Sequence, residues 1–166
     1  MQLWQRRTLG ALALGGSFVG LSLGFEQLFN PVSVWDKLLL IPFLALYGWG
    51  IWSGVALLEN ANGALRLNRR FWAVQIPFLS SPIAGYMFAS GCLLYASFYP
   101  ADIRFHFDVR FGSQFGYSLL QFEQPWAFGI NLFAVCIYTY LTWCIRHEAS
   151  AESLRSEIMI ESTPSA

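Results

Sequence analysis

Four long runs of apolar residues, separated by polar connections, dominate the chain. They cover residues 8–25, 38–58, 71–98 and 126–145, and none of them contains Asp, Glu, Lys, Arg or His. A helix needs about 20 apolar residues to cross a hydrocarbon core about 30 Å thick. A charged side chain near the bilayer centre costs at least about 2.5 kcal/mol, so uncharged runs of this length are typical of membrane spans. The pattern therefore predicts four transmembrane helices.

The segment between the third and fourth runs has a different period. Apolar and polar residues alternate over 103–111, which is typical of a strand with one apolar face. Gly112-Ser113 suits a two-residue turn, and the apolar FGYSLLQF that follows can return as a second strand. We therefore predict a β-hairpin over residues 102–122, with Phe111 opposite Gln114 and its apolar face on the membrane helices.

Together these segments predict an all-α membrane protein, a four-transmembrane-helix bundle with a small extracytoplasmic β-hairpin between helices 3 and 4. Residues 1–146 form the membrane domain, and residues 147–166 form a cytoplasmic tail that we expect to be partly disordered from Glu161 onward. Basic residues favour the cytoplasmic side of short connections. With the amino terminus inside, the inner set is Arg6, Arg7, Arg66, Arg69, Arg70, Arg146 and Arg155, against Lys37, Arg104 and Arg110 outside. We expect a multi-pass protein of the inner (plasma) membrane with both termini cytoplasmic.

The first run also has the charge pattern of a signal peptide, because Arg6 and Arg7 precede it. It ends in Leu23, Gly24 and Phe25, which form no small-residue cleavage site. We therefore expect an uncleaved first helix.

Composition agrees with a membrane protein. Only 12% of the residues are charged and 17% are aromatic, whereas soluble domains carry about 25% charged residues. The net charge is zero, so no overall field would attract nucleic acid. Cys92, Cys136 and Cys144 lie singly in apolar runs, and we expect them to act as small apolar residues.

Two features of the apolar runs suggest contacts inside the membrane. Gly16, Gly20 and Gly24 recur every four residues and allow close helix packing, either within one chain or between two copies. Pro77 and Pro82 should kink the third helix, and irregular backbone at membrane depth must be buried or line a wet cavity. The candidate intramembrane polar site near this kink consists of Gln75, Ser80, Ser81 and Asn131. The same side chains would equally serve as hydrogen-bonding partners of neighbouring helices.

Chemistry of other kinds finds little support in the residues. No nucleophile–base pair, phosphate loop or dinucleotide fingerprint is present, so we expect neither enzymatic activity nor a cofactor. His106, Asp102 and Asp108 share one face of the predicted strand. Successive residues on that face are about 6.5–7 Å apart, too far to meet one metal ion without bending. We expect solvated side chains there and no metal site.

The leading hypothesis is an accessory or interaction protein of the membrane that uses its outer hairpin as a contact surface for another membrane protein. The candidate surface consists of Phe105, Phe107, Phe111, Phe115 and Tyr117. The alternative is a transporter-like protein that handles a small solute or a lipid through the kinked third helix. An aromatic face left open would favour the first hypothesis, and a continuous polar cavity would favour the second.

Overall fold

The computed structural model describes residues 1–30, 33–101 and 103–161, with side chains as far as residue 150. Its helices are α1 (Leu3–Phe29), α2 (Val34–Leu58), α3 (Ala64–Val74) and α4 (Leu132–Glu161). Its strands are β1 (Pro77–Ser80), β2 (Ala84–Ala89), β3 (Cys92–Tyr99), β4 (Arg104–Phe111), β5 (Gln114–Leu119) and β6 (Ala127–Asn131). The fold therefore combines four helices with a six-stranded antiparallel sheet, and the predicted all-α four-helix bundle is wrong.

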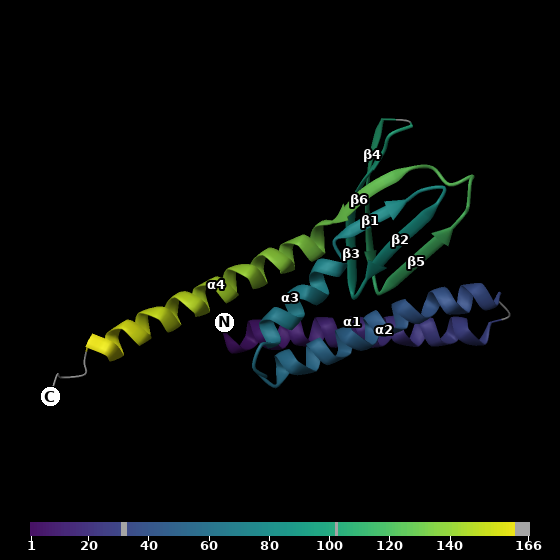
Figure 1. The fold of residues 1–166 in the computed structure, drawn as a ribbon. Helices are drawn as coiled ribbons and strands as arrows, with labels where there is room; N and C mark the ends of the chain where they lie inside the picture. The colour runs from purple at the N-terminus through teal and green to yellow at the C-terminus, as the bar shows by residue number, and fades with distance from the viewer. Residues whose placement is uncertain (31–32, 102, 162–166) are drawn as a thin grey trace.

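Helices α1 and α2 form an antiparallel pair that lies along one side of the sheet (Figure 1). Glycines let the two helices approach closely: a Cβ on Gly20 would overlap the ring of Tyr47, and a Cβ on Gly54 would lie 2.7 Å from the backbone nitrogen of Leu14. Gly16 faces the sheet instead, where an added Cβ would lie 2.6 Å from the backbone nitrogen of Gly91. The spacing of small residues thus serves packing within the chain.

Two of the helices, α1 and α2, are long and apolar enough to cross a membrane, as predicted for the first two runs. The third run is not one helix. Its first residues are the end of α3, and the rest of it forms β1, β2 and β3. Helix α3 ends at Val74, Pro77 opens β1, and Pro82 lies in the turn before β2, so the predicted proline kink of a third helix is wrong. The fourth run is divided between β6 and α4. Its helical part, residues 132–145, is only about 21 Å long at 1.5 Å per residue.

The sheet has the strand order β4-β3-β6-β1-β2-β5, with every neighbouring pair antiparallel. Strands β2 and β3 pair with β5 and β4 in one continuous register, in which Ala89 faces Gln114 and Cys92 faces Phe111. The four strands therefore form one long hairpin. One arm consists of β2 and β3, the other of β4 and β5, and the connection between the arms lies between Tyr99 and Arg104. This hairpin bends where Gly91 (φ +89°) and Gly112 adopt the left-handed backbone conformation that glycine favours. Strands β6 and β1 lie between the β3–β4 part and the β2–β5 part of this bent hairpin.

The predicted outer hairpin is consequently wrong in its pairing. Both predicted strands exist, but β4 and β5 lie at opposite edges of the sheet (Figure 1). Phe111 faces Cys92 of β3, and Gln114 faces Ala89 of β2. Residue 102, the first of the predicted hairpin, lies outside the described residues. Residues 162–166 of the tail that we predict to be disordered also lie outside them.

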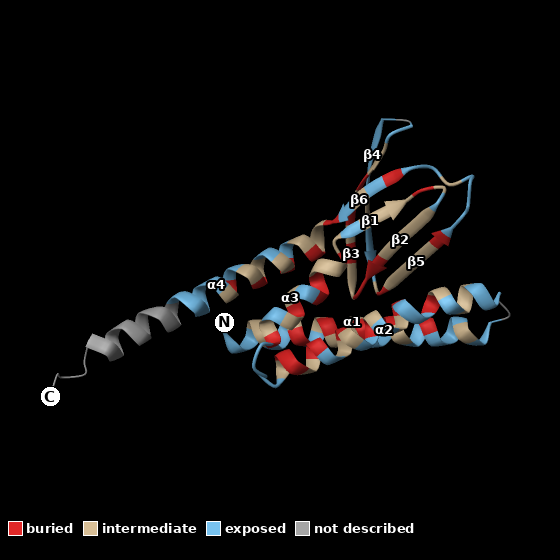
Figure 2. Cartoon of the chain, in the orientation of Figure 1, coloured by how far each residue is buried: buried red, intermediate tan, exposed pale blue. Residues whose placement is uncertain are grey.

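The core lies where the sheet meets the helix pair, and buried residues gather there in Figure 2. Aromatic rings dominate this contact: Tyr47 and Phe88 have ring centres 4.8 Å apart, and those of Phe43 and Phe115 are 5.6 Å apart. The phenol of Tyr117 donates a 3.0 Å hydrogen bond to the carbonyl of Asp36, near the start of α2. The β2–β5 side of the sheet is thus fixed along the first half of α2.

Candidate functional site

The candidate polar residues of the third and fourth runs do not converge. Gln75 is 1% exposed and follows the end of α3. Its Oε1 accepts a 2.7 Å hydrogen bond from the backbone N–H of Ser90, and its Nε2 donates a 3.4 Å hydrogen bond to the carbonyl of Phe71. Gln75 therefore ties α3 to the bend of the long hairpin, which is a structural task.

Asn131 holds the first turn of α4. Its Oδ1 accepts hydrogen bonds from the backbone N–H of Ala134 at 3.4 Å and of Leu94 at 3.3 Å. The first contact satisfies one of the free donors at the start of a helix, as an N-cap residue does. The Nδ2 of Asn131 is buried and has no hydrogen-bond partner among the described residues.

Ser81 and Ser80 have different partners again. The Oγ of Ser81 lies in the turn between β1 and β2, where it accepts a 3.0 Å hydrogen bond from the N–H of Ala84. The hydroxyl of Ser80 donates to Oε1 of Gln124 at 3.2 Å, and the hydroxyl of Ser118 donates to the same oxygen at 3.1 Å. This small polar cluster borders an open hollow of about 730 Å³ formed with residues 121–125. Its Ser118 and Gln124 belong to no motif in the sequence.

The predicted interaction surface is divided between two environments. Phe115 and Tyr117 pack against α2 and are half-buried. Along β4, in contrast, the apolar row predicted to lie on the membrane domain is open (Figure 2). The exposed fractions are 72% for Phe105, 66% for Phe107, 55% for Val109 and 85% for Phe111. This part of the facing prediction is wrong, because β4 lies at the far edge of the sheet from the strands that cover α2.

The open apolar row continues onto the neighbouring strands. Phe98 of β3 faces Phe105 on one side, with ring centres 5.0 Å apart, and Phe128 of β6 on the other. Residues opposite each other in a sheet share a face, so Phe128 and Ile130 extend the row across β6. Both of these side chains are exposed. The result is one apolar face over β4, β3 and β6, which we call the open face.

Strand β4 also has a free edge. Among the described residues it pairs only with β3. The N–H of Leu94 points away from β4, toward Oδ1 of Asn131, so Val109 opposite Leu94 is in a non-hydrogen-bonded pair. Because this pattern alternates along an antiparallel pair, the backbone groups of Phe105, Phe107 and Val109 point outward from the sheet. The open face and the free backbone groups therefore belong to the same residues.

The opposite face of β4 is charged and carries Arg104, His106, Asp108 and Arg110. The Nε of Arg110 lies 2.6 Å from Oδ2 of Asp108. Tyr95 of β3 faces Asp108 across the pair. Burial, followed by the negative charge of Asp108, raises the pKa of the Tyr95 phenol above its ordinary value. Among the described residues, no group of three His, Cys, Asp or Glu side chains could hold a metal ion, and Asp102 lies outside them.

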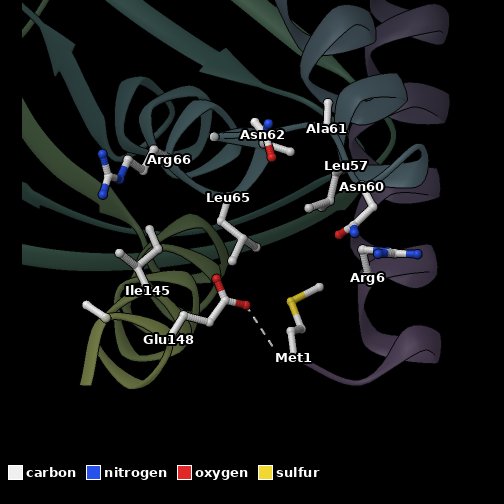
Figure 3. Close-up of a pocket in the computed structure, with 13 residues that line it drawn as sticks. Met1, Arg6, Leu57, Asn60, Ala61, Asn62, Leu65, Arg66, Ile145 and Glu148 are labelled. Carbon is white, nitrogen blue, oxygen red and sulfur yellow. Dashed lines mark ion pairs between the residues drawn. The ribbon is translucent and has the colours of Figure 1, made fainter. Parts of the chain in front are cut away.

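A further cavity of about 410 Å³ lies near the beginning of α1, the α2–α3 connection and α4 (Figure 3). The terminal ammonium of Met1 lies 3.6 Å from Oε1 of Glu148 across it. The side chains of Arg6 and Arg66 lie on opposite sides of the cavity and point away from each other. They therefore do not converge on a common ligand position. Comparisons of the chain with protein-family models, curated proteins and solved structures gave no match.

Proposed function

We propose that this protein is a membrane-embedded interaction protein that binds a partner protein through β4. The observation that carries the proposal is the open apolar row of β4 on a free strand edge. Phe111 alone is 85% exposed. Large exposed apolar surfaces on proteins are typical of sites that contact another protein or a membrane, and an exposed strand edge is a template for pairing with another strand.

Several features support placement of α1 and α2 in a bilayer. In the most apolar 18-residue stretch of each helix, only 33% is buried inside the protein. The core helix of a soluble protein would be mostly buried. Large apolar side chains such as Phe18, Ile41 and Trp52 are exposed along the pair. Helix α1 packs closely on α2 and on the sheet through Gly20 and Gly16, which supports a retained helix over a removable signal sequence.

Charge supports the same orientation as before. Arg6 and Arg7 are near the start of α1 and Arg66 is near the start of α3, so they lie at the end of the helix pair where α1 begins and α2 leads into α3. Lys37 is near the start of α2, at the other end. Figure 1 shows these two ends of the pair. By the positive-inside rule we propose that the first end faces the cytoplasm of an inner membrane.

The depth of the sheet favours a protein over lipid as the occupant of the β4 edge. The hydroxyl of Ser113, two residues after β4, donates a hydrogen bond to the carbonyl of Gly16 in the middle of α1. One end of β4 thus lies at the level of the membrane centre if α1 spans the bilayer. Lipid offers no partners for free backbone N–H and C=O groups, so open sheet edges do not occur facing hydrocarbon.

The transporter-like alternative has less support. Gln75, Ser80, Ser81 and Asn131 each bond to a different segment, so they do not converge on one polar site.

Site-specific photocross-linking in native membranes tests the proposal. A photoreactive phenylalanine analogue at Phe107 should give discrete protein adducts, because this side chain belongs to the open row. The matched control is the same analogue at Phe18, which is similarly exposed, 62% against 66%, but lies on the proposed lipid face of α1. A Phe107 variant that gives no protein adduct beyond that of the Phe18 control would contradict the proposed function.

A further inference from the structure

The geometry of β4 points to a second copy of this chain as the partner. We propose that two β4 strands pair edge to edge and antiparallel across a twofold axis at His106. This inference rests on the proposed function and names the occupant of the same site. The resulting sheet would run through both copies, and the contact would be closed and self-complementary, as in most homodimers.

Backbone geometry allows only some registers. The residues that point their N–H and C=O groups outward from β4 are the odd-numbered ones, so an odd-numbered residue must face an odd-numbered residue of the second copy. With the axis at His106, Phe105 faces Phe107 of the second copy, and the reverse pair forms by symmetry. The even-numbered residues then form non-hydrogen-bonded pairs, in which side chains lie closest together.

Charge selects among the allowed registers. With the axis at His106, Arg104 faces Asp108 of the second copy, and symmetry gives this pair twice. An axis at Phe107 would place Arg104 opposite Arg110, which is repulsive. An axis at Asp108 would place that carboxylate opposite itself. Opposite charges across strands stabilise pairing and like charges destabilise it, so the first of these three registers is favoured.

An axis at Val109 also pairs opposite charges, Asp108 with Arg110. It would, however, place Phe105 of one copy beside Ser113 of the other. There β4 has already bent at Gly112 (φ +104°), and Ser113 contacts α1. The axis at His106 keeps the pairing away from this bend. It uses the part of β4 that, among the described residues, pairs with β3 on one edge and has no strand on the other.

The apolar face gains from the same register. Phe105 of each copy lies opposite Phe107 of the other, and both already belong to the open face. Aromatic pairs directly opposite each other are among the more stabilising cross-strand contacts. The open face would thus become continuous between the two copies.

Cysteine cross-linking tests the pairing and the register. In a chain whose Cys92, Cys136 and Cys144 are replaced by Ala, His106→Cys should form a disulfide-linked dimer on mild oxidation in membranes. The facing Cα atoms would be about 4.5 Å apart, which suits a disulfide. Arg110→Cys on the same face is the matched control, because the two copies of residue 110 would be roughly 26 Å apart along the strands. Dimer from the Arg110 variant without dimer from the His106 variant would overturn the proposed register.

A charge exchange tests whether the partner is the same chain. Arg104→Asp and Asp108→Arg should each weaken dimer formation roughly tenfold, since each converts two attractive pairs into repulsive ones. The double variant restores both pairs within a homodimer and should recover dimerisation. Circular dichroism checks that the double variant folds like the unchanged chain. A folded double variant that does not recover dimerisation would overturn the charge register.

The photocross-linking adduct at Phe107 separates this inference from the proposed function. An adduct of about twice 18.8 kDa that contains only this chain supports self-pairing. An adduct with a different protein overturns self-pairing and leaves the proposed function standing. The absence of any specific protein adduct overturns both.

Discussion

Substitution of Gly20 should destabilise the helix pair, whereas the same change at Gly15 should not. A Cβ at Gly20 would overlap the Tyr47 ring, and Tyr47 is itself fully buried against Phe88. The ring therefore has no free space to move into. Overpacking of this kind costs about 1–3 kcal/mol. At Gly15 no atom lies within 4 Å of the added Cβ, and alanine favours a helix over glycine by up to about 1 kcal/mol.

Thermal unfolding of the detergent-solubilised protein, followed by tryptophan fluorescence, measures both variants. We expect Gly20→Ala to lower the midpoint of unfolding, and Gly15→Ala to leave it unchanged or raise it. Both variants make the same change, one added methyl group, in the same helix. Detergent and helix propensity therefore affect them alike. Equal shifts in both variants would refute the close contact between α1 and α2 at Tyr47.

Three further predictions, the last with a matched pair of variants, concern the sheet and its junctions with α3 and α4. Gln75→Leu should destabilise the fold by about 1–3 kcal/mol, because it leaves the buried N–H of Ser90 without an acceptor. Denaturant titration measures this loss of stability, and an unchanged midpoint would contradict the structural role of Gln75. Asn131→Ala should lower stability by about 1 kcal/mol through loss of the N-cap of α4, seen as reduced helical circular dichroism at elevated temperature. Phe88→Ala should cost about 3–5 kcal/mol, because Phe88 is 1% exposed. Phe107→Ala should change the stability of the monomer by about 0.5 kcal/mol or less, and similar losses in both variants would contradict the open face.

The first half of the fold follows from the sequence for a simple reason. The runs that form α1 and α2 are long and uncharged, and the helices accommodate their glycines and Pro42 without a break. Uncharged runs of about 20 apolar residues are typical of helices long enough to cross a membrane. Gly20 and Gly24 make the predicted helix contacts, against Tyr47 and Leu44 of α2, whereas Gly16 contacts the sheet.

The third run misled because absence of charge does not distinguish a membrane span from a set of buried strands. In strand β3, Leu93, Tyr95 and Ser97 are buried on one face, and the apolar residues between them are half-buried on the other. Buried strands read as continuous apolar segments rather than as an alternation. The signals for a break were present: Pro77, Pro82 and the Ser90-Gly91 pair divide the run into pieces of strand length.

The alternation over 103–111 predicted β4 correctly but could not identify its partner. In the predicted register Phe105 faces Leu120, and in the structure it faces Phe98. Both registers place apolar residues together on one face, so the period of two does not choose between them. The structure selects the longer pairing, because β2–β3 and β4–β5 form one continuous hairpin that uses the glycines as bends and not as a turn. Strand β4 is consequently paired on one side only. The apolar row that the predicted hairpin would have laid on the helices is left open, and this makes β4 the strand available to a partner.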